Sequence, residues 1–347
     1  MVPTHSFKKL LCIASIASLL VLQSSCTLAE RLKQPIEDFK AATSIVAESA
    51  REAYVEINET SVDEGLRTAQ CTDVRPDKNC KPRQLSAADL ANERTISNAG
   101  MRARLEALDT LDKYVKLLAE LANSDKPEKI TEASDDLQSS IDKLAVQLTK
   151  LKKPEASDDA NGSAAALNDN DNKFVASVHV FSTAIGLLFS AIGNRKRDKA
   201  LKKAVIDGDI AVTNIISGLE TDFRIFWSQK IEAADNDIRA ARTAFNTELQ
   251  TATVTNGHRD DSASLQKLRD DFRKSVDLRD TIVTTNPSTA LENMKDAHEK
   301  LVKLAEEPTD DNFVASAAAI QAYLGAATRL GTAIIKLHSL KSKEDSK

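Results

Sequence analysis

Apolar residues recur every three or four positions along most of this chain, which is the spacing of one face of an α-helix. The first such run extends from Arg31 to about Asn58. A second opens at Ser86, where Ser86 and Asp89 have the spacing of a helix N-cap, and continues to about Ala122. A third runs from Ile130 to Leu151. We therefore expect three long helices, with heptad-like apolar seams, in an N-terminal helical region at residues 26-153.

The same spacing continues in the C-terminal half, at residues 173-341. From Lys196 to about Thr251 it is not interrupted by proline, and a continuous helix of this length would be roughly 80 Å long. Asn256 and Gly257 then predict a turn, after which a shorter helix is expected from Leu265 to about Val283. Two further helices are expected on either side of Pro308, and residues 342-347 form a charged tail.

One stretch, Phe174 to Gly193, is apolar on all sides and is followed at once by a cluster of basic residues. An all-round apolar helix lies either in the core of a bundle or in a membrane, and this stretch has close to the ~20 residues that a membrane span needs. Both interpretations stay open on the sequence. The residues that would carry either role are four apolar side chains and one small contact residue, Phe174, Phe181, Ile185, Phe189 and Gly186.

Composition supports a helical fold. The chain has 10 Gly, 8 Pro and 4% aromatic residues against 29% charged residues, as in proteins of long helices with few turns. We predict an all-α, elongated bundle of about seven or eight helices, divided by an acidic, unpatterned linker at 154-172.

Removal of the leader lysines, Lys8 and Lys9, takes the net charge from -5 to -7, which disfavours nucleic acid as a partner.

Residues 1-25 have the features of an export signal: Lys8 and Lys9, an apolar run, and small residues directly before Cys26. Cys26 stands where a bacterial lipoprotein carries its lipid, although Gln23 occupies the place of the usual bulky apolar residue. We therefore expect an exported protein of the bacterial envelope, in the periplasm or at the outer membrane. Lipidation at Cys26 would hold it on a membrane, and the alternatives are cleavage to a free soluble form and retention of the leader as an anchor.

Cys71 and Cys80 close a short loop, and in an exported protein this spacing predicts a disulfide that stabilises the fold by about 2 to 3 kcal/mol. A metal site is the weaker interpretation, because no histidine or further cysteine lies nearby in the sequence. His298, on an apolar helix face, is interpreted as a hydrogen-bonded histidine at the core boundary, and not as a ligand or catalyst. We expect no metal and no cofactor.

The motifs of the common enzyme classes are missing from the sequence, which has no H-E-x-x-H, G-x-S-x-G or phosphate-binding glycine string. Most acidic residues fall on the polar faces of expected helices, where solvation explains them. The sequence thus favours a non-catalytic lipoprotein with a structural, scaffolding or partner-binding role. Its expected partners are a membrane, held through the lipid, and a protein, bound through the helix faces.

The general layout from about residue 160 to 250 resembles that of α-helical pore-forming toxins of the cytolysin A and haemolysin BL type. The shared features are a flexible entry segment, an apolar stretch in mid-chain and a very long helix that follows it, and no specific motif is shared. The resemblance implies an alternative function, in which residues 174-193 insert into a membrane.

Overall fold

The computed structural model of the chain describes most of the expected helices. The described residues are 28–70, 96–124, 126–152, 197–251, 254–255, 258–259, 263–284 and 286–345. Within them the fold is all-α, as predicted, apart from one pair of two-residue strands.

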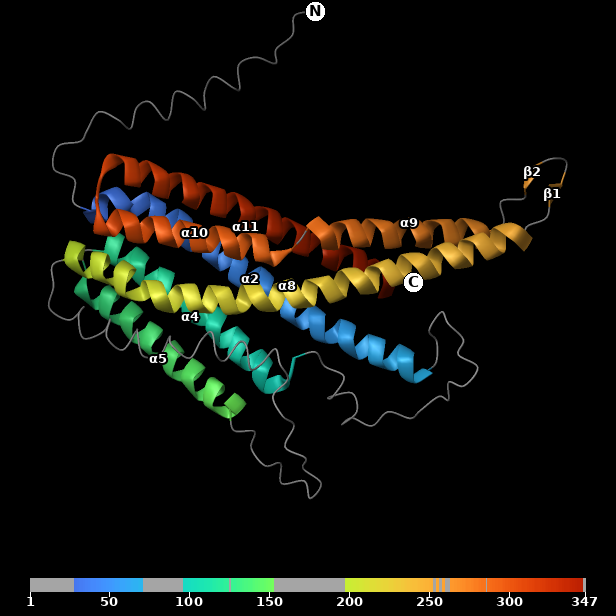
Figure 1. The fold of residues 1–347 in the computed structure, drawn as a ribbon, viewed down its shortest axis with the longest axis horizontal. Helices are drawn as coiled ribbons and strands as arrows, with labels where there is room; N and C mark the ends of the chain where they lie inside the picture. The colour runs from blue at the N-terminus through green and yellow to red at the C-terminus, as the bar shows by residue number, and fades with distance from the viewer. Residues whose placement is uncertain are drawn as a thin grey trace, which may run out of the picture.

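Three helices come from the N-terminal region: α2 (Leu28–Gln70), α4 (Asn98–Asn123) and α5 (Pro127–Lys152). Helix α4 packs on α2 with one side and on α5 with another, so it is the middle helix of this group. Figure 1 shows α2 and α4 crossing the body of the molecule, with α5 on its outer edge.

The C-terminal half supplies α8 (Arg197–Thr251), α9 (Ala263–Thr284), α10 (Pro287–Glu306) and α11 (Asp310–Asp345). Between α8 and α9 the strands β1 (Val254–Thr255) and β2 (His258–Arg259) pair in antiparallel fashion. Helix α10 lies on α8 and α11, and α11 lies on α2, so the two halves of the chain share one body. Helices α8 and α9 extend together past the ends of α4, α5 and α10 (Figure 1).

All these helices contribute to one apolar core. Phe223, Phe226 and Trp227 form an aromatic layer in this core, and none of the three side chains is more than 1% exposed. Trp227 also donates a hydrogen bond from Nε1 to the carbonyl oxygen of Ile282, at 2.7 Å, and so ties the end of α9 to the middle of α8.

The predicted continuity of the second helix was wrong, because the chain is not helical at Ile96 and Ser97; Ser86 itself lies outside the described residues. Helix α4 begins at Asn98, and Ser97 is its N-cap, with Oγ accepting a hydrogen bond from the Gly100 backbone at 2.9 Å. The side-chain amide of Asn58 binds both backbone groups of Ile96, at 3.1 and 3.2 Å, and holds it outside the helix. Since Ile96 is fully buried, this contact also anchors the start of α4 on α2.

Candidate functional site

A chain of hydrogen bonds joins three helices inside the bundle, centred on His298 of α10. The His298 ring is completely buried, and its Nδ1 lies 3.1 Å from Oδ1 of Asp209 on α8. Its Nε2 lies 2.9 Å from the hydroxyl oxygen of Tyr114 on α4. That hydroxyl is also 3.3 Å from the carbonyl oxygen of Ala204. His298 is therefore hydrogen-bonded as expected, but it is a core residue and not a boundary residue.

The order carboxylate, imidazole, hydroxyl is the order in which enzymes activate a nucleophile. Here the hydroxyl belongs to a tyrosine that is itself fully buried, and burial together with the negative charge of Asp209 raises the pKa of Tyr114 well above its usual value. The hydrogen bond from His298 lowers the pKa of Asp209, so this carboxylate stays ionised at a lower pH than a free aspartate does. The Tyr114 side chain is 0% exposed, and the contacts act to hold α4, α8 and α10 together.

Gly208 makes room for the hydrogen bonds between Tyr114, His298 and Asp209. A Cβ atom at this position would lie 2.8 Å from the Tyr114 ring, closer than carbon atoms approach one another. The glycine next to Asp209 therefore lets the tyrosine ring lie directly against α8.

A second polar group lies further along α8, around Asp222. Arg104 of α4 donates from Nε to Oδ2 of Asp222 at 2.7 Å and from Nη2 to Oδ1 at 3.1 Å, a bidentate pair. The hydroxyl of Tyr54, from α2, donates to Oδ2 at 3.2 Å. All three side chains are at most 2% exposed. Burial is the largest cause of the strongly raised pKa of Tyr54, and the charge of Asp222 is the next.

Neither group was found from the sequence, although a signal exists in both helices. Arg104 and Asp222 each stand at a position where the helical spacing calls for an apolar residue. A single charge on an apolar stripe looks like an interruption of the pattern. Two opposite charges of this kind, on two different helices, would have indicated a buried pair.

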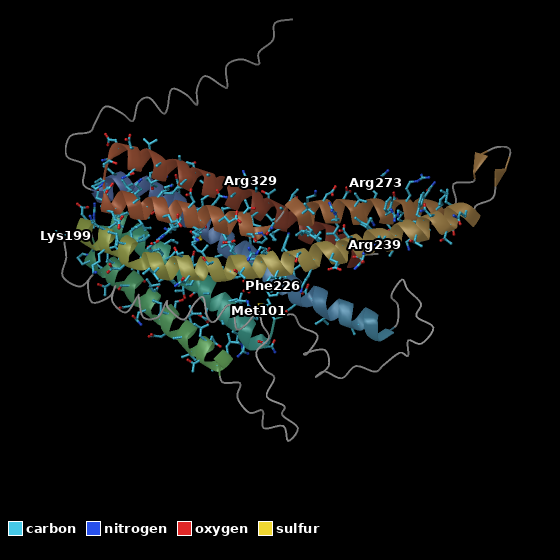
Figure 2. The ribbon with its side chains drawn as sticks, in the orientation of Figure 1. Met101, Lys199, Phe226, Arg239, Arg273 and Arg329 are labelled. Atoms are coloured by element: carbon cyan, nitrogen blue, oxygen red, sulfur yellow. The ribbon has the colours of Figure 1, made fainter. Side chains whose placement is uncertain are left out.

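The outer parts of α8 and α9 form a two-helix arm, which we define as residues 235–251 and 263–280. No residue from Asp235 to Gln250 is buried, and none from Gln266 to Asp280. The arm nevertheless carries an apolar seam whose members are all only half-buried: Ile238, Ala241, Phe245, Leu268, Phe272 and Val276. Figure 2 shows Arg239 and Arg273 on the two helices of this arm.

The predicted site residues lie outside the described residues. This holds for Cys26, for Cys71 and Cys80, and for the stretch with Phe174, Phe181, Ile185, Gly186 and Phe189. The lipid anchor, the disulfide and the membrane-active alternative therefore stay predictions. For the last of these, the test is dye release from liposomes, which Phe181→Asp should abolish.

Two searches of the described residues gave no candidates. No described helix is long and apolar enough to cross a membrane. Within the same ranges, no group of three or more His, Cys, Asp or Glu side chains is placed to hold a metal ion.

In comparisons with known proteins, no family model matches this chain, and no curated protein or solved structure matches it. Its function therefore has to be argued from its own residues.

Proposed function

We propose that this protein is an exported, non-catalytic lipoprotein of the bacterial envelope, held on a membrane by lipid at Cys26, and that it binds a protein partner through the α8–α9 arm. The observation that carries the proposal is the half-buried seam of the arm. Its alternative, catalysis, is not favoured by either polar group, because Tyr114, His298, Arg104 and Tyr54, the side chains that would have to react, are all fully buried.

The contrast within α8 supports a binding role for the arm. Phe223, Phe226 and Trp227, in the part of α8 that crosses the bundle, are at most 1% exposed. Phe245, on the same helix, is only half-buried. Apolar surface left exposed in a row along an extended element is typical of a protein-binding site. A partner helix laid along the seam would bury these side chains further and gain about 25 cal/mol for each Å² of apolar surface that it covers.

The beginning of α2 fits a lipid anchor close to the bundle. Helix α2 starts at Leu28, only two residues after Cys26, and Ala29 is already fully buried. A lipid on Cys26 would thus hold the folded body with almost no spacer. The arm lies at the opposite end of the molecule (Figure 1), where a partner could reach it without meeting the membrane.

The anchor and the binding surface are tested separately. For the anchor, Cys26→Ala should move the protein from the membrane fraction to the soluble fraction, and unchanged fractionation would refute lipidation as the means of attachment.

For the binding surface, a photo-crosslinking amino acid is placed at Arg273 on the arm and, as a matched control, at Arg329 on α11 of the bundle. Both arginines are exposed, and Figure 2 shows where each lies. The expected result is a defined crosslinked product from position 273 in intact cells and none from position 329. Equal products from both positions, or none from 273, would refute the arm as the binding surface.

A further inference from the structure

Two contacts fix how α8 and α9 lie against each other in the arm. Arg279 donates from Nε to Oδ1 of Asp235 at 3.0 Å, at the end of the arm that joins the bundle. Ser264 donates from Oγ to Oε1 of Glu248 at 2.6 Å, close to the tip. The two helices are therefore antiparallel, and these contacts set which positions of the arm lie opposite one another.

Four arginines border the apolar seam of the arm. Each of them comes directly after a seam residue, and all four are exposed: Arg239 and Arg242 on α8, and Arg269 and Arg273 on α9. One step along an α-helix is a turn of about 100°. Because the helices are antiparallel, this step leads to the same side of the seam in both of them. We call this side the arginine side of the arm.

The register brings these arginines close together along the arm. Counted from the two contacts, Arg239 lies opposite residues 273–275 of α9. At about 1.5 Å per residue, all four arginines fall within about 9 Å of arm length. Figure 2 shows Arg239 and Arg273 at the same level of the two helices.

Three of the arginines have no carboxylate partner inside the fold. Arg239 donates to the side-chain oxygen of an asparagine one turn before it. In the part of the chain that the structure describes, Arg242 and Arg273 take part in no hydrogen bond or ion pair. Asp235, one turn before Arg239, is bound by Arg279 instead. These three guanidinium groups are therefore available to a partner.

We infer that the arginine side of the arm binds an acidic amphipathic helix of the partner protein. The inference rests on the proposed function, in which the arm is the partner-binding surface. It adds the chemistry of the partner and the side of the arm on which the partner lies.

The arginine side combines apolar surface with a border of cations. Ile238 and Val276 lie beside the arginines, and both side chains are only half-buried. A guanidinium group binds a carboxylate through two parallel hydrogen bonds, and arginine is enriched in protein interfaces. The matching partner is a helix that lays its apolar face on the seam and carries Asp or Glu along the edge of that face.

Other anionic partners fit the arm less well. The arm as a whole has seven acidic and seven basic residues, so nucleic acid or an anionic membrane would meet as many like charges as opposite ones. A second copy of this chain, docked by two-fold symmetry through the same side, would set arginines against arginines. An acidic helix that contacts the arginine side alone avoids both conflicts.

The test compares the two sides of the seam by photo-crosslinking in intact cells. The crosslinking amino acid is placed at Asn246, which follows Phe245 on the arginine side, or at Ala244, which precedes Phe245 and lies on the other side; both positions are exposed. A defined product is expected from position 246 and none from 244. In the chain labelled at 246, Arg239→Gln with Arg242→Gln should lower the yield of this product about tenfold.

The control pair is Lys267→Gln with Lys274→Gln, which removes the same charge from the face of α9 that is turned away from the seam. This pair should leave the yield unchanged, and circular dichroism checks that each variant is folded. Mass spectrometry of the product should identify a segment of another protein with acidic residues on both edges of an apolar helix face.

Several outcomes would overturn the inference: equal yields from positions 244 and 246, equal loss in both pairs, a crosslinked segment without acidic residues, or a product that joins two copies of this chain. If position 273 gives a product that Arg239→Gln with Arg242→Gln does not lower, the arm remains the binding surface and only the acidic partner is refuted. Absence of any product from the arm refutes the proposed function as well.

Discussion

Asp222→Ala should be the most damaging single substitution among the polar residues of the core. It removes the carboxylate that binds Nε and Nη2 of Arg104 and the hydroxyl of Tyr54. The Arg104 guanidinium would stay buried, because its side chain is 0% exposed and is packed 6.0 Å from the centre of the Phe226 ring. Taking away one partner of such a buried pair costs about 3 to 5 kcal/mol.

The loss of stability in Asp222→Ala should come from the buried positive charge of Arg104 that is left without a partner, and not from the loss of the hydrogen bonds themselves. The double substitution Arg104→Met with Asp222→Leu removes both charges and fills the space with apolar groups. We expect it to recover most of the lost stability, since apolar replacements of buried ion pairs are often neutral or stabilising. A matched surface pair gives the reference: Arg279 and Asp235 lie 3.0 Å apart but are exposed, and Asp235→Ala should change little.

The assay is urea unfolding at neutral pH, followed by circular dichroism and by fluorescence of the single tryptophan. The reasoning would be refuted if Asp222→Ala cost no more than Asp235→Ala. It would also be refuted if the double substitution were as unstable as the sum of the two single ones, because the charge of Arg104 would then not be the cause.

Two further predictions concern glycines and tyrosines. Gly208→Ala should lower the free energy of unfolding by about 1 to 3 kcal/mol, because its Cβ would meet the buried Tyr114 ring at 2.8 Å. Gly325→Ala, whose Cβ has no neighbour nearer than 3.6 Å, should gain up to about 1 kcal/mol in the same urea assay. All three tyrosines of the chain, Tyr54, Tyr114 and Tyr323, are buried with raised pKa values. Burial of the neutral tyrosines stabilises the folded state below the unfolded pKa of about 10, and this stabilisation is lost as pH rises. Tyrosinate absorbance should therefore appear only together with unfolding. A gradual titration near pH 10 before unfolding would contradict this.

The helices themselves could be predicted from the sequence because burial leaves a direct record in the spacing of apolar residues. Helix α8 was expected from Lys196 to about Thr251 and runs from Arg197 to Thr251. Helix α2 was expected to end near Asn58 and continues to Gln70. Among the α2 side chains that the structure describes, Ile57 is the last in the core, and Val62 and Leu66 beyond it are only half-buried.

The same pattern could not say which seams are covered. Along α8, the spacing of apolar residues is as regular around Phe245 as around Phe223. The first lies in the half-exposed arm and the second in the core. Periodicity records that one face of a helix is apolar, but what covers that face depends on neighbours that may be far away in the sequence.

The sequence also could not say what the basic residues after Gly193 contact. In the fold, Arg197 is paired with Glu30 and Asp198 binds the backbone of Ala29, which places the start of α8 beside the start of α2. These contacts join positions 167 and 169 residues apart, which no local pattern records.

Helix α8 joins the core of the bundle to the arm on which the proposed function depends. Asp222, in its middle, lies in the core, and its last turns form the arm. The helix is continuous over 55 residues, about 80 Å, and is clamped by α4 through both buried polar groups. The direction of the arm is therefore set by how the middle of α8 packs against α4 and α10 in the bundle.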